Sequence, residues 1–260
     1  MKKIYFLSGM QRSGSTLLSC LLNQHPEIYA TPTSPMLDII SSCGKTLDEV
    51  YEQYTFNYEE KNKSLVNGIL SSFHENVDKP IIVDKHRGWI AAAKLIKDFY
   101  PPKIICTNRS VPEVISSFIK LIENNKSTNN TVDKSLRNSG LPISVNNRSD
   151  YIFNYFVDHP RKSIIEGLSE YGDLIHIVEY NDLVCNPQET MDKVYKFLDI
   201  KKYNHNFDNI DNTCKEKKDF SWGIENLHVI RDKLQKTSTP PEEVLGKELT
   251  EYYSQFDIKY

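Results

Sequence analysis

The first residues that could do chemistry lie in the stretch FLSGMQRSGSTLL, residues 6 to 18. Gly9, Gly14 and Thr16 match the two glycines and the hydroxyl residue of the Walker phosphate-binding loop, G-x-x-x-x-G-K-[ST]. Ser15 stands where that loop has its lysine, and Arg12 comes three residues earlier. Glycines let backbone N–H groups approach a phosphate closely, and the N-terminus of the helix that follows favours its negative charge. The stretch therefore predicts an oxyanion-binding loop that does not use a Walker lysine.

Side chains of the same stretch add hydrogen-bond donors. Ser13 and Ser15 are small, Ser15 and Thr16 offer hydroxyl groups, and Arg12 supplies a planar guanidinium suited to oxyanions. A Gly/Ser turn between a strand and a helix would have a similar composition, so the loop alone leaves a purely structural interpretation open. Partner residues elsewhere in the chain must decide between the two.

The elements that would position this loop alternate between strands and helices. Short apolar runs predict strands at 4–7, 80–86, 102–109 and 174–183, and apolar residues at helical spacing predict helices at 17–22, 89–100, 111–123 and 186–200. Pro112 and Pro187 suit the first turns of their helices, and Asn186 is a suitable cap. Because such alternation implies parallel crossovers, we expect an α/β fold, an open, mostly parallel sheet of the P-loop type with helices on both faces.

Two segments lack this alternation. Residues 124–150 are polar and aperiodic, which predicts a long surface loop or lid. Residues 201–240 are charged and irregular apart from one aromatic island, FSWG. Since we find no internal repeat and no composition shift typical of a linker, we expect a single domain over residues 1–260, a length that can bury a full core.

The composition narrows the classes of function. Hydrophobic residues make up 39% of the chain, charged residues 26%, and the net charge is −3, which excludes a strongly basic nucleic-acid binder. An anion site must therefore be built from a few well-placed cations. The five cysteines are scattered without a C-x-x-C pair, which predicts reduced thiols and a cytoplasmic protein. No apolar run approaches the ~20 residues of a membrane span.

The stretch RSGSTLLSCLLNQHPEI, which begins at Arg12, resembles the sulfotransferases that use 3′-phosphoadenosine 5′-phosphosulfate (PAPS). It is most similar to the protein-tyrosine sulfotransferase branch and its bacterial relatives, where R-S-G-[ST]-T opens the first helix and H-P-[DE] ends it. The resemblance implies PAPS as sulfuryl donor, 3′-phosphoadenosine 5′-phosphate (PAP) as product, and no required metal.

The same resemblance implies two further motifs, and the chain has both. The first is a strand that ends in arginine, with serine eight residues on, and these residues hold the 3′-phosphate of the donor; Arg109 and Ser117 match it in IICTNRSVPEVISSF. The second is a strand that ends in Y-x-D-L before a helix that starts with proline, and Tyr180 and Asp182 match it. Three matches in the expected order imply a donor site made by Gly9, Arg12, Ser13, Gly14, Ser15, Thr16, Arg109, Ser117 and Tyr180.

The chemistry requires cations at the oxygen that the sulfuryl group leaves. As in phosphoryl transfer, the protein mainly positions the groups and stabilises charge. Arg12 is one such cation. Lys85 is the second, because it ends a predicted strand, where ligands gather in open α/β sheets, and because the resemblance implies a lysine there that contacts the sulfuryl group. Arg87 lies beside it with no assigned role.

A base must take the proton of the acceptor. The resemblance implies either a histidine two residues after the lysine or a glutamate in the region of ATPTSPM, and this chain has neither. The missing glutamate weighs against the idea that this chain shares the tyrosine acceptor of that branch. By elimination we expect His86 as the base, with Asp84 as the second choice. His25 is interpreted as a helix-end residue.

Residues near the C-terminus could complete the donor site. Arg231, Lys233 and Lys236 are candidates for the 3′-phosphate, although the run LHVIRDKLQK also suits a solvated amphipathic helix, and Trp222 suits either stacking or burial. Two other functions stay open: a P-loop kinase or NTPase with a degenerate Walker motif, and an inactive nucleotide-binding module. The acceptor, a carbohydrate, peptide, lipid or small molecule, and the oligomeric state are not determined by the sequence.

Overall fold

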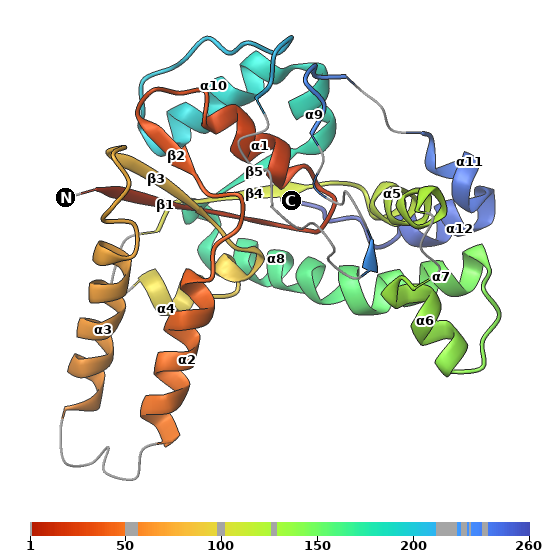
Figure 1. Cartoon of the computed structure of the whole chain (residues 1–260), viewed down its shortest axis with the longest axis horizontal. Coiled ribbons are helices and arrows are strands. Elements are labelled where there is room, and N and C mark those ends of the chain that lie inside the picture. Colours follow the sequence, from red (N-terminus) through yellow and green to blue (C-terminus); the bar gives the residue numbers. More distant parts are fainter. Residues whose placement is uncertain are drawn as a thin grey trace.

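The centre of the structure is a five-stranded sheet in which every strand pairs in parallel, in the order β2-β3-β1-β4-β5 (Figure 1). The structure is a computed structural model that describes residues 2–49, 57–97, 102–125, 129–211, 223–224, 228, 230–235 and 239–260. The strands are β1 (Lys3–Gly9), β2 (Ile28–Ala30), β3 (Ile81–Lys85), β4 (Ile104–Asn108) and β5 (Ile175–Glu179). The predicted open parallel sheet is confirmed.

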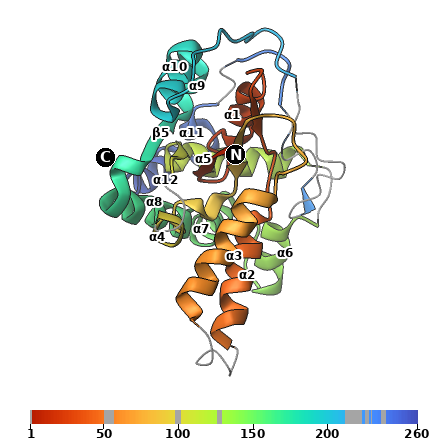
Figure 2. The ribbon, with the colours of Figure 1, turned by 90° about the vertical axis from the view of Figure 1, so that its left-hand side faces the viewer.

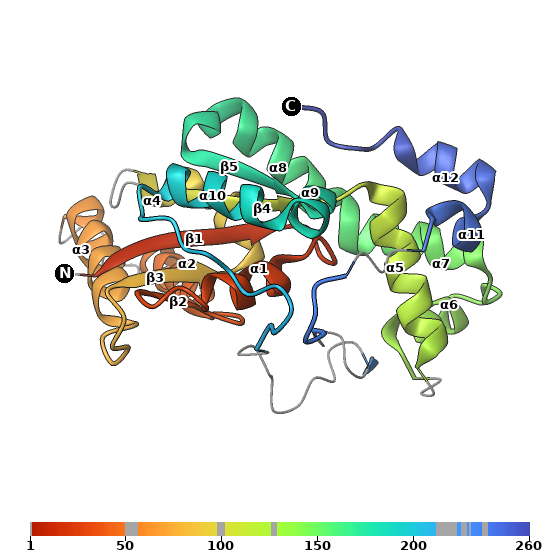
Figure 3. The same cartoon turned by 90° about the horizontal axis from the view of Figure 1, so that it is seen from above.

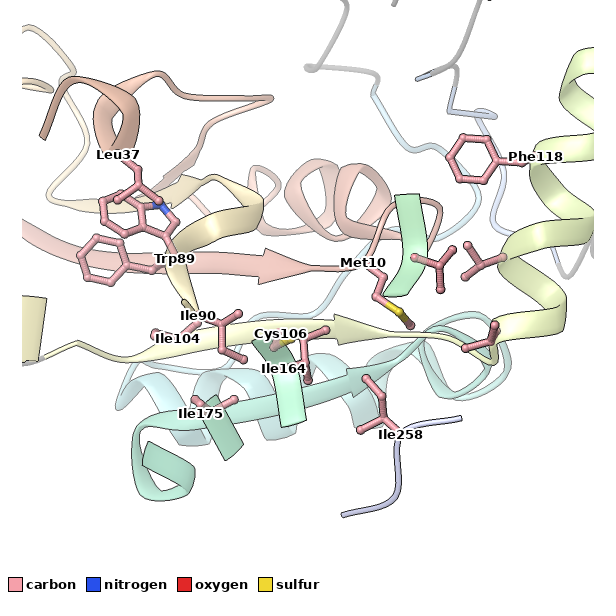
Figure 4. Close-up of a cluster of buried hydrophobic side chains, with 14 of the residues drawn as sticks. Met10, Leu37, Trp89, Ile90, Ile104, Cys106, Phe118, Ile164, Ile175 and Ile258 are labelled. Atoms are coloured by element: carbon pink, nitrogen blue, oxygen red, sulfur yellow. The ribbon is translucent and has the colours of Figure 1, made fainter. Parts of the chain in front are cut away.

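The sheet is buried on both faces, which explains why its strands are continuous apolar runs. Side chains of β1 alternate between two hydrophobic clusters: Ile4 and Phe6 belong to one, and Tyr5 and Leu7 to the other. Figure 4 shows part of the first cluster, where Trp89 lies beside Leu37 and where Ile104 and Cys106 belong to β4. The loop that follows β1 is therefore anchored in the middle of the core.

Helices cover both faces, as predicted. α1 (Ser15–Leu22), α9 (Tyr180–Cys185) and α10 (Pro187–Leu198) pack with the cluster that contains Leu7. α4 (Ala93–Lys97) and α8 (Asp158–Tyr171) pack with the cluster that contains Phe6. α2 (Met36–Glu49) and α3 (Tyr58–Ser72) run side by side and project from the body of the molecule (Figures 1 and 2). No helix within the described ranges has the length and apolar character needed to cross a bilayer.

The remaining helices lie beyond the carboxyl ends of the strands (Figure 3). They are α5 (Val111–Asn124), α6 (Thr131–Asn138), α7 (Val145–Ile152), the π-helical turn η3 (Phe153–Val157), α11 (Pro241–Leu245) and α12 (Lys247–Ser254). A short 3₁₀ turn, η4 (Gly172–Leu174), leads into β5. The first residues of α5 are thus held at the same edge of the sheet as the loop after β1.

The prediction of a long loop or lid over residues 124–150 is wrong, because α6 and α7 occupy most of this segment. Its polar residues act as caps: the side chain of Asn130 accepts from Asp133 N, and that of Ser144 accepts from Asn147 N. The guanidinium of Arg148 then joins the two helices through a bidentate pair with the Asp133 carboxylate, both contacts being 2.8 Å. This pairing is tertiary, so no local pattern reveals it.

Two element boundaries also differ from those predicted. The described part of the helix expected over 89–100 is a 3₁₀ turn, η2 (Arg87–Trp89), followed by the short α4, and residues 98–100 lie outside the described residues. The strand expected over 174–183 ends at Glu179, and Tyr180 begins α9. The Y-x-D-L motif therefore lies on a helical turn instead of a strand, and its tyrosine leaves the sheet at the strand's carboxyl end.

Candidate active site

The loop between β1 and α1 has backbone conformations that few residues adopt. Gly9 has φ +137°, and a Cβ atom there would lie 2.2 Å from Thr107 Oγ1. Gly14 has φ +92° and a Cβ atom would lie 2.8 Å from a ring carbon of Tyr180. Arg12 has φ +60° without being glycine, a strained conformation that persists only where the surroundings fix it. The glycine positions are thus set by close contact.

The hydroxyl of Ser13 is used inside the loop. It is fully buried, donates to Met10 O at 2.5 Å and lies 2.7 Å from Thr107 Oγ1. Of the predicted donors in the loop, Ser13 can therefore offer a ligand only its backbone N–H. Ser15 and Thr16 open α1, where backbone N–H groups lack partners within the helix.

Lys85 reaches the loop from the neighbouring strand. In the register of β1 and β3, Leu7 lies opposite Lys85. The Lys85 ammonium donates to Thr16 Oγ1 at 2.9 Å, and its backbone N donates to Thr31 Oγ1 at 2.7 Å. A lysine from β3 thus stands over the N-terminus of α1, the place for which the loop itself supplies no lysine.

Asp84 does not fit the role of base that we gave it as second choice. It is fully buried, and its two carboxylate oxygens accept from Trp89 Nε1 at 2.9 Å and contact His74 Nε2 at 2.8 Å. Neighbouring residues of a strand point to opposite faces, so Asp84 points away from the face to which Lys85 points. Its carboxylate stabilises the core beneath η2.

His86, which we predicted as the base, lines the cavity with both ring nitrogens close to polar groups. Nδ1 lies 3.1 Å from Gly88 N, a backbone group that can only donate. Nδ1 therefore keeps its lone pair, and the proton of the neutral ring is on Nε2. Nε2 lies 3.4 Å from Oδ1 of Asp38. His86 presents a donor to this side of the site and has no second lone pair to accept a proton.

Arg109 lies against the loop after β1. Its Nη1 donates to Arg12 O at 3.2 Å, its Nε lies 3.3 Å from Glu113 Oε2, and its guanidinium lies over the ring of Tyr180 at 4.0 Å. Arg12 Nε in turn donates to Ser117 Oγ at 3.3 Å. The residues predicted from separate motifs, Arg12, Arg109, Ser117 and Tyr180, are therefore brought together.

These side chains border a cavity of about 710 Å³, a size typical of ligand sites. Six cations line it, Arg12, Lys85, Arg87, Arg109, Arg231 and Lys233, with Asp38 as the single carboxylate among the described lining residues. Gly14, Ser15, Thr16, His86 and Tyr180 also border it, whereas Gly9, Ser13 and Ser117 support its wall without lining it. The charge is local, since the whole chain carries −3.

The C-terminal candidates have different outcomes. Arg231 and Lys233 line the cavity, and the described residues 230–235 form no helix, contrary to the helical alternative. Two backbone hydrogen bonds hold this segment: Ile210 N donates to Asp232 O, and Leu234 N donates to Phe207 O. The Lys233 ammonium also forms an ion pair with Asp208, 2.5 Å from Oδ1. Trp222 and Lys236 lie outside the described residues.

Two of the residues that the sequence singled out lie away from the cavity. Asp182 is exposed on α9 and does not line it. His25 is buried after the end of α1, where Nδ1 accepts from Glu27 N, as expected of a helix-end residue. No cluster of three or more potential metal ligands occurs within the described ranges.

Sequence reasoning missed residues that belong to no motif. Thr31 directly follows β2 and lies beside Lys85, and Asp38 lies in the first turn of α2. Ile210 and Ile230 add an apolar part to the cavity from the irregular tail. Thr31 could have been found from its place after an apolar strand in a parallel sheet, whereas Asp38 gives no signal because only tertiary packing brings α2 to His86.

Sheet, loop and cavity define a P-loop-type α/β protein with a cation-lined cavity at the carboxyl ends of its strands. A sequence model described as the sulfotransferase family matches residues 5–204, and the chain belongs to this family. A comparison with curated proteins gave no match.

Solved structures agree with this fold. The sulfotransferase domain from the curacin biosynthetic pathway is similar with a TM-score of 0.61 and 18% identity, over 98% of this chain and 96% of that chain. The sulfotransferase domain from the olefin synthase of Synechococcus PCC 7002 has a TM-score of 0.50 and 17% identity, over 98% of this chain and 94% of that chain. A sulfotransferase from Alicyclobacillus acidocaldarius has a TM-score of 0.50 and 13% identity, over 84% of this chain and 87% of that chain.

Proposed function

We propose that this protein transfers a sulfuryl group from PAPS to a hydroxyl or amine of an acceptor by in-line displacement. The observation that carries the proposal is the contact of the Lys85 ammonium with Thr16 Oγ1 above the first turn of α1. This contact puts a cation beside an anion-binding helix N-terminus in a chain of the sulfotransferase family.

The residues of the cavity fit a donor with two phosphate groups. The backbone N–H groups of 14–16 and the Arg12 side chain suit the 5′-phosphosulfate end. Arg109, next to Ser117 and stacked on Tyr180, suits the 3′-phosphate at a short distance from the loop. The apolar side chains of Val184, Ile210 and Ile230 suit the base.

In the transfer step, Lys85 and Arg12 stabilise the negative charge that grows on the bridging oxygen as the sulfur–oxygen bond breaks. Both cations are held before the donor arrives, Lys85 by Thr16 and Arg12 by the strained loop and Ser117. Such preorganised charges need no rearrangement during the reaction, and removal of one donor of this kind costs about 10²- to 10³-fold in rate.

The experiment that tests the proposal combines donor binding with transfer. In calorimetry with EDTA, we expect PAP to bind the wild-type protein and Lys85→Ala with similar affinity. With labelled PAPS and a panel of carbohydrates, phenols, peptides and lipids, we expect the wild type to label an acceptor and Lys85→Ala to lose about 10²- to 10³-fold in rate. Lys94→Ala, which changes an exposed lysine of α4 that does not line the cavity, is the matched control.

The alternatives predict other results. A kinase or NTPase would bind ATP with Mg²⁺ and give no heat with PAP. An inactive nucleotide-binding module would bind PAP and label no acceptor. The acceptor class and the cytoplasmic location remain predictions.

A further inference from the structure

The proton of the His86 imidazole has a fixed position in this site. Because Nδ1 accepts from Gly88 N at 3.1 Å, the ring is neutral and carries its proton on Nε2. That N–H has an acceptor nearby, since Oδ1 of Asp38 lies 3.4 Å from Nε2. The contact orients the carboxylate and leaves the imidazole without a lone pair for catalysis.

Asp38 lies where an acceptor would meet the donor. It lines the cavity together with Lys85 and Arg87, and its side chain is 69% exposed. It belongs to the first turn of α2. Ser34 fixes the start of this helix, because its Oγ accepts from Met36 N at 3.2 Å. A carboxylate has about four lone-pair sites, so the His86 contact leaves room for a further hydrogen bond.

We propose that Asp38 is the general base of the transfer and that His86 is its positioning residue, an inference that rests on the proposed function. As the acceptor oxygen forms its bond to sulfur, the acceptor O–H bond breaks and its proton goes to the Asp38 carboxylate. The bond between sulfur and the bridging oxygen breaks at the same time, and its electron pair stays on the 5′-phosphate of PAP. Asp38 then releases the proton to water.

The first test uses the full-length protein with PAPS and the acceptor of highest turnover in the panel. Asp38→Ala is expected to lose about 10²- to 10⁴-fold in kcat with PAP affinity unchanged, and added formate restores part of the rate. His86→Gln keeps an N–H donor for Asp38, so it is expected to lose at most about tenfold in kcat, the worth of one hydrogen bond that is not remade. Asp48→Ala removes the same charge from the exposed end of α2 and keeps the wild-type rate.

The opposite order of effects would overturn the assignment. If His86→Gln costs more than Asp38→Ala, and formate does not raise the rate of Asp38→Ala, the imidazole is the base. If all variants and the wild type fail to bind PAP, the proposed function itself is wrong, so the two failures are distinguishable.

The second test needs no turnover. With ¹⁵N-labelled histidine in the wild-type protein, NMR should show the His86 proton on Nε2 at neutral pH, and Asp38→Asn should shift the Nε2–H resonance. A proton on Nδ1, or a resonance that Asp38→Asn leaves unmoved, would contradict the arrangement on which the proposal depends.

Discussion

The guanidinium of Arg109 touches both halves of the proposed donor site. One of its five N–H groups donates to Arg12 O, a second faces Glu113, and one face covers the ring of Tyr180. It is also buried, at 7% exposure. A charged group held so tightly has little freedom to lose when a phosphate binds, which favours a strong contact.

We expect Arg109→Ala to weaken PAP binding by about 10- to 100-fold, the range of one charged hydrogen bond. Adenosine 5′-monophosphate lacks the 3′-phosphate, so its affinity should fall by less than about threefold. Calorimetry with both nucleotides measures the two effects, and Arg137→Ala, an exposed arginine of α6, is the control. An equal loss for both nucleotides would mean that Arg109 acts only by holding the loop through Arg12 O.

At the scale of elements, His205 holds residues 201–210 against α10 and against Gln24, which follows α1. The imidazole stacks on Tyr195 with an interplanar angle of 4°, its Nδ1 lies 3.1 Å from Gln24 Oε1, and its Nε2 lies 2.9 Å from Tyr195 OH. Burial, together with the nearby His25, lowers the pKa of His205 to about 4. This segment also supplies Ile210 to the cavity.

The difference between the pKa of His205 in the folded and in the unfolded state makes the stability of the protein depend on pH. An unfolded chain titrates histidine near pH 6.5, so between about pH 4 and 6.5 the unfolded state binds the proton that the folded state excludes. The free energy of unfolding should therefore fall as pH falls through this window, and His205 accounts for about 2 kcal/mol between pH 7 and pH 5. Urea unfolding at pH 7 and at pH 5 measures this change in the free energy of unfolding. The change should be smaller in His205→Gln than in the wild type, and the same as in the wild type in His159→Gln. A wild-type difference retained in His205→Gln would contradict this role.

The sequence predicted the elements where local pattern and tertiary packing agree. The strands at 81–85 and 104–108 and the helix from Val111 are buried apolar runs with their own start signals, and they lie as expected. α6 and α7 were missed because Asn and Ser are frequent in loops and also cap helices, and the deciding Arg148–Asp133 pair is 15 residues apart. The same limit applies to the site, where motifs gave Lys85 and Arg109, whereas Asp38 depends on how α2 packs.

For the whole molecule, both ends of the described chain make contacts with the central sheet and with the start of α5. β1 is the central strand and carries the loop, with the ring of Phe6 4.3 Å from that of Trp89. At the other end, Asp257 Oδ1 accepts from Val111 N at 2.6 Å at the start of α5, and Tyr260 OH donates to Glu179 at the end of β5. A single domain over residues 1–260 stays a prediction.

A single domain that binds PAP should unfold as one unit, and PAP should stabilise all of it. We expect urea unfolding followed by tryptophan fluorescence and by far-UV circular dichroism to give one coincident transition. At a PAP concentration 100 times its dissociation constant, the free energy of unfolding should rise by about 2.7 kcal/mol by both probes. Hydrogen exchange should then slow in β1 and in α12 alike, because Asp257 ties the end of the chain to α5. A second transition that PAP leaves in place, or protection confined to the sheet, would show that the C-terminal helices form a separate unit.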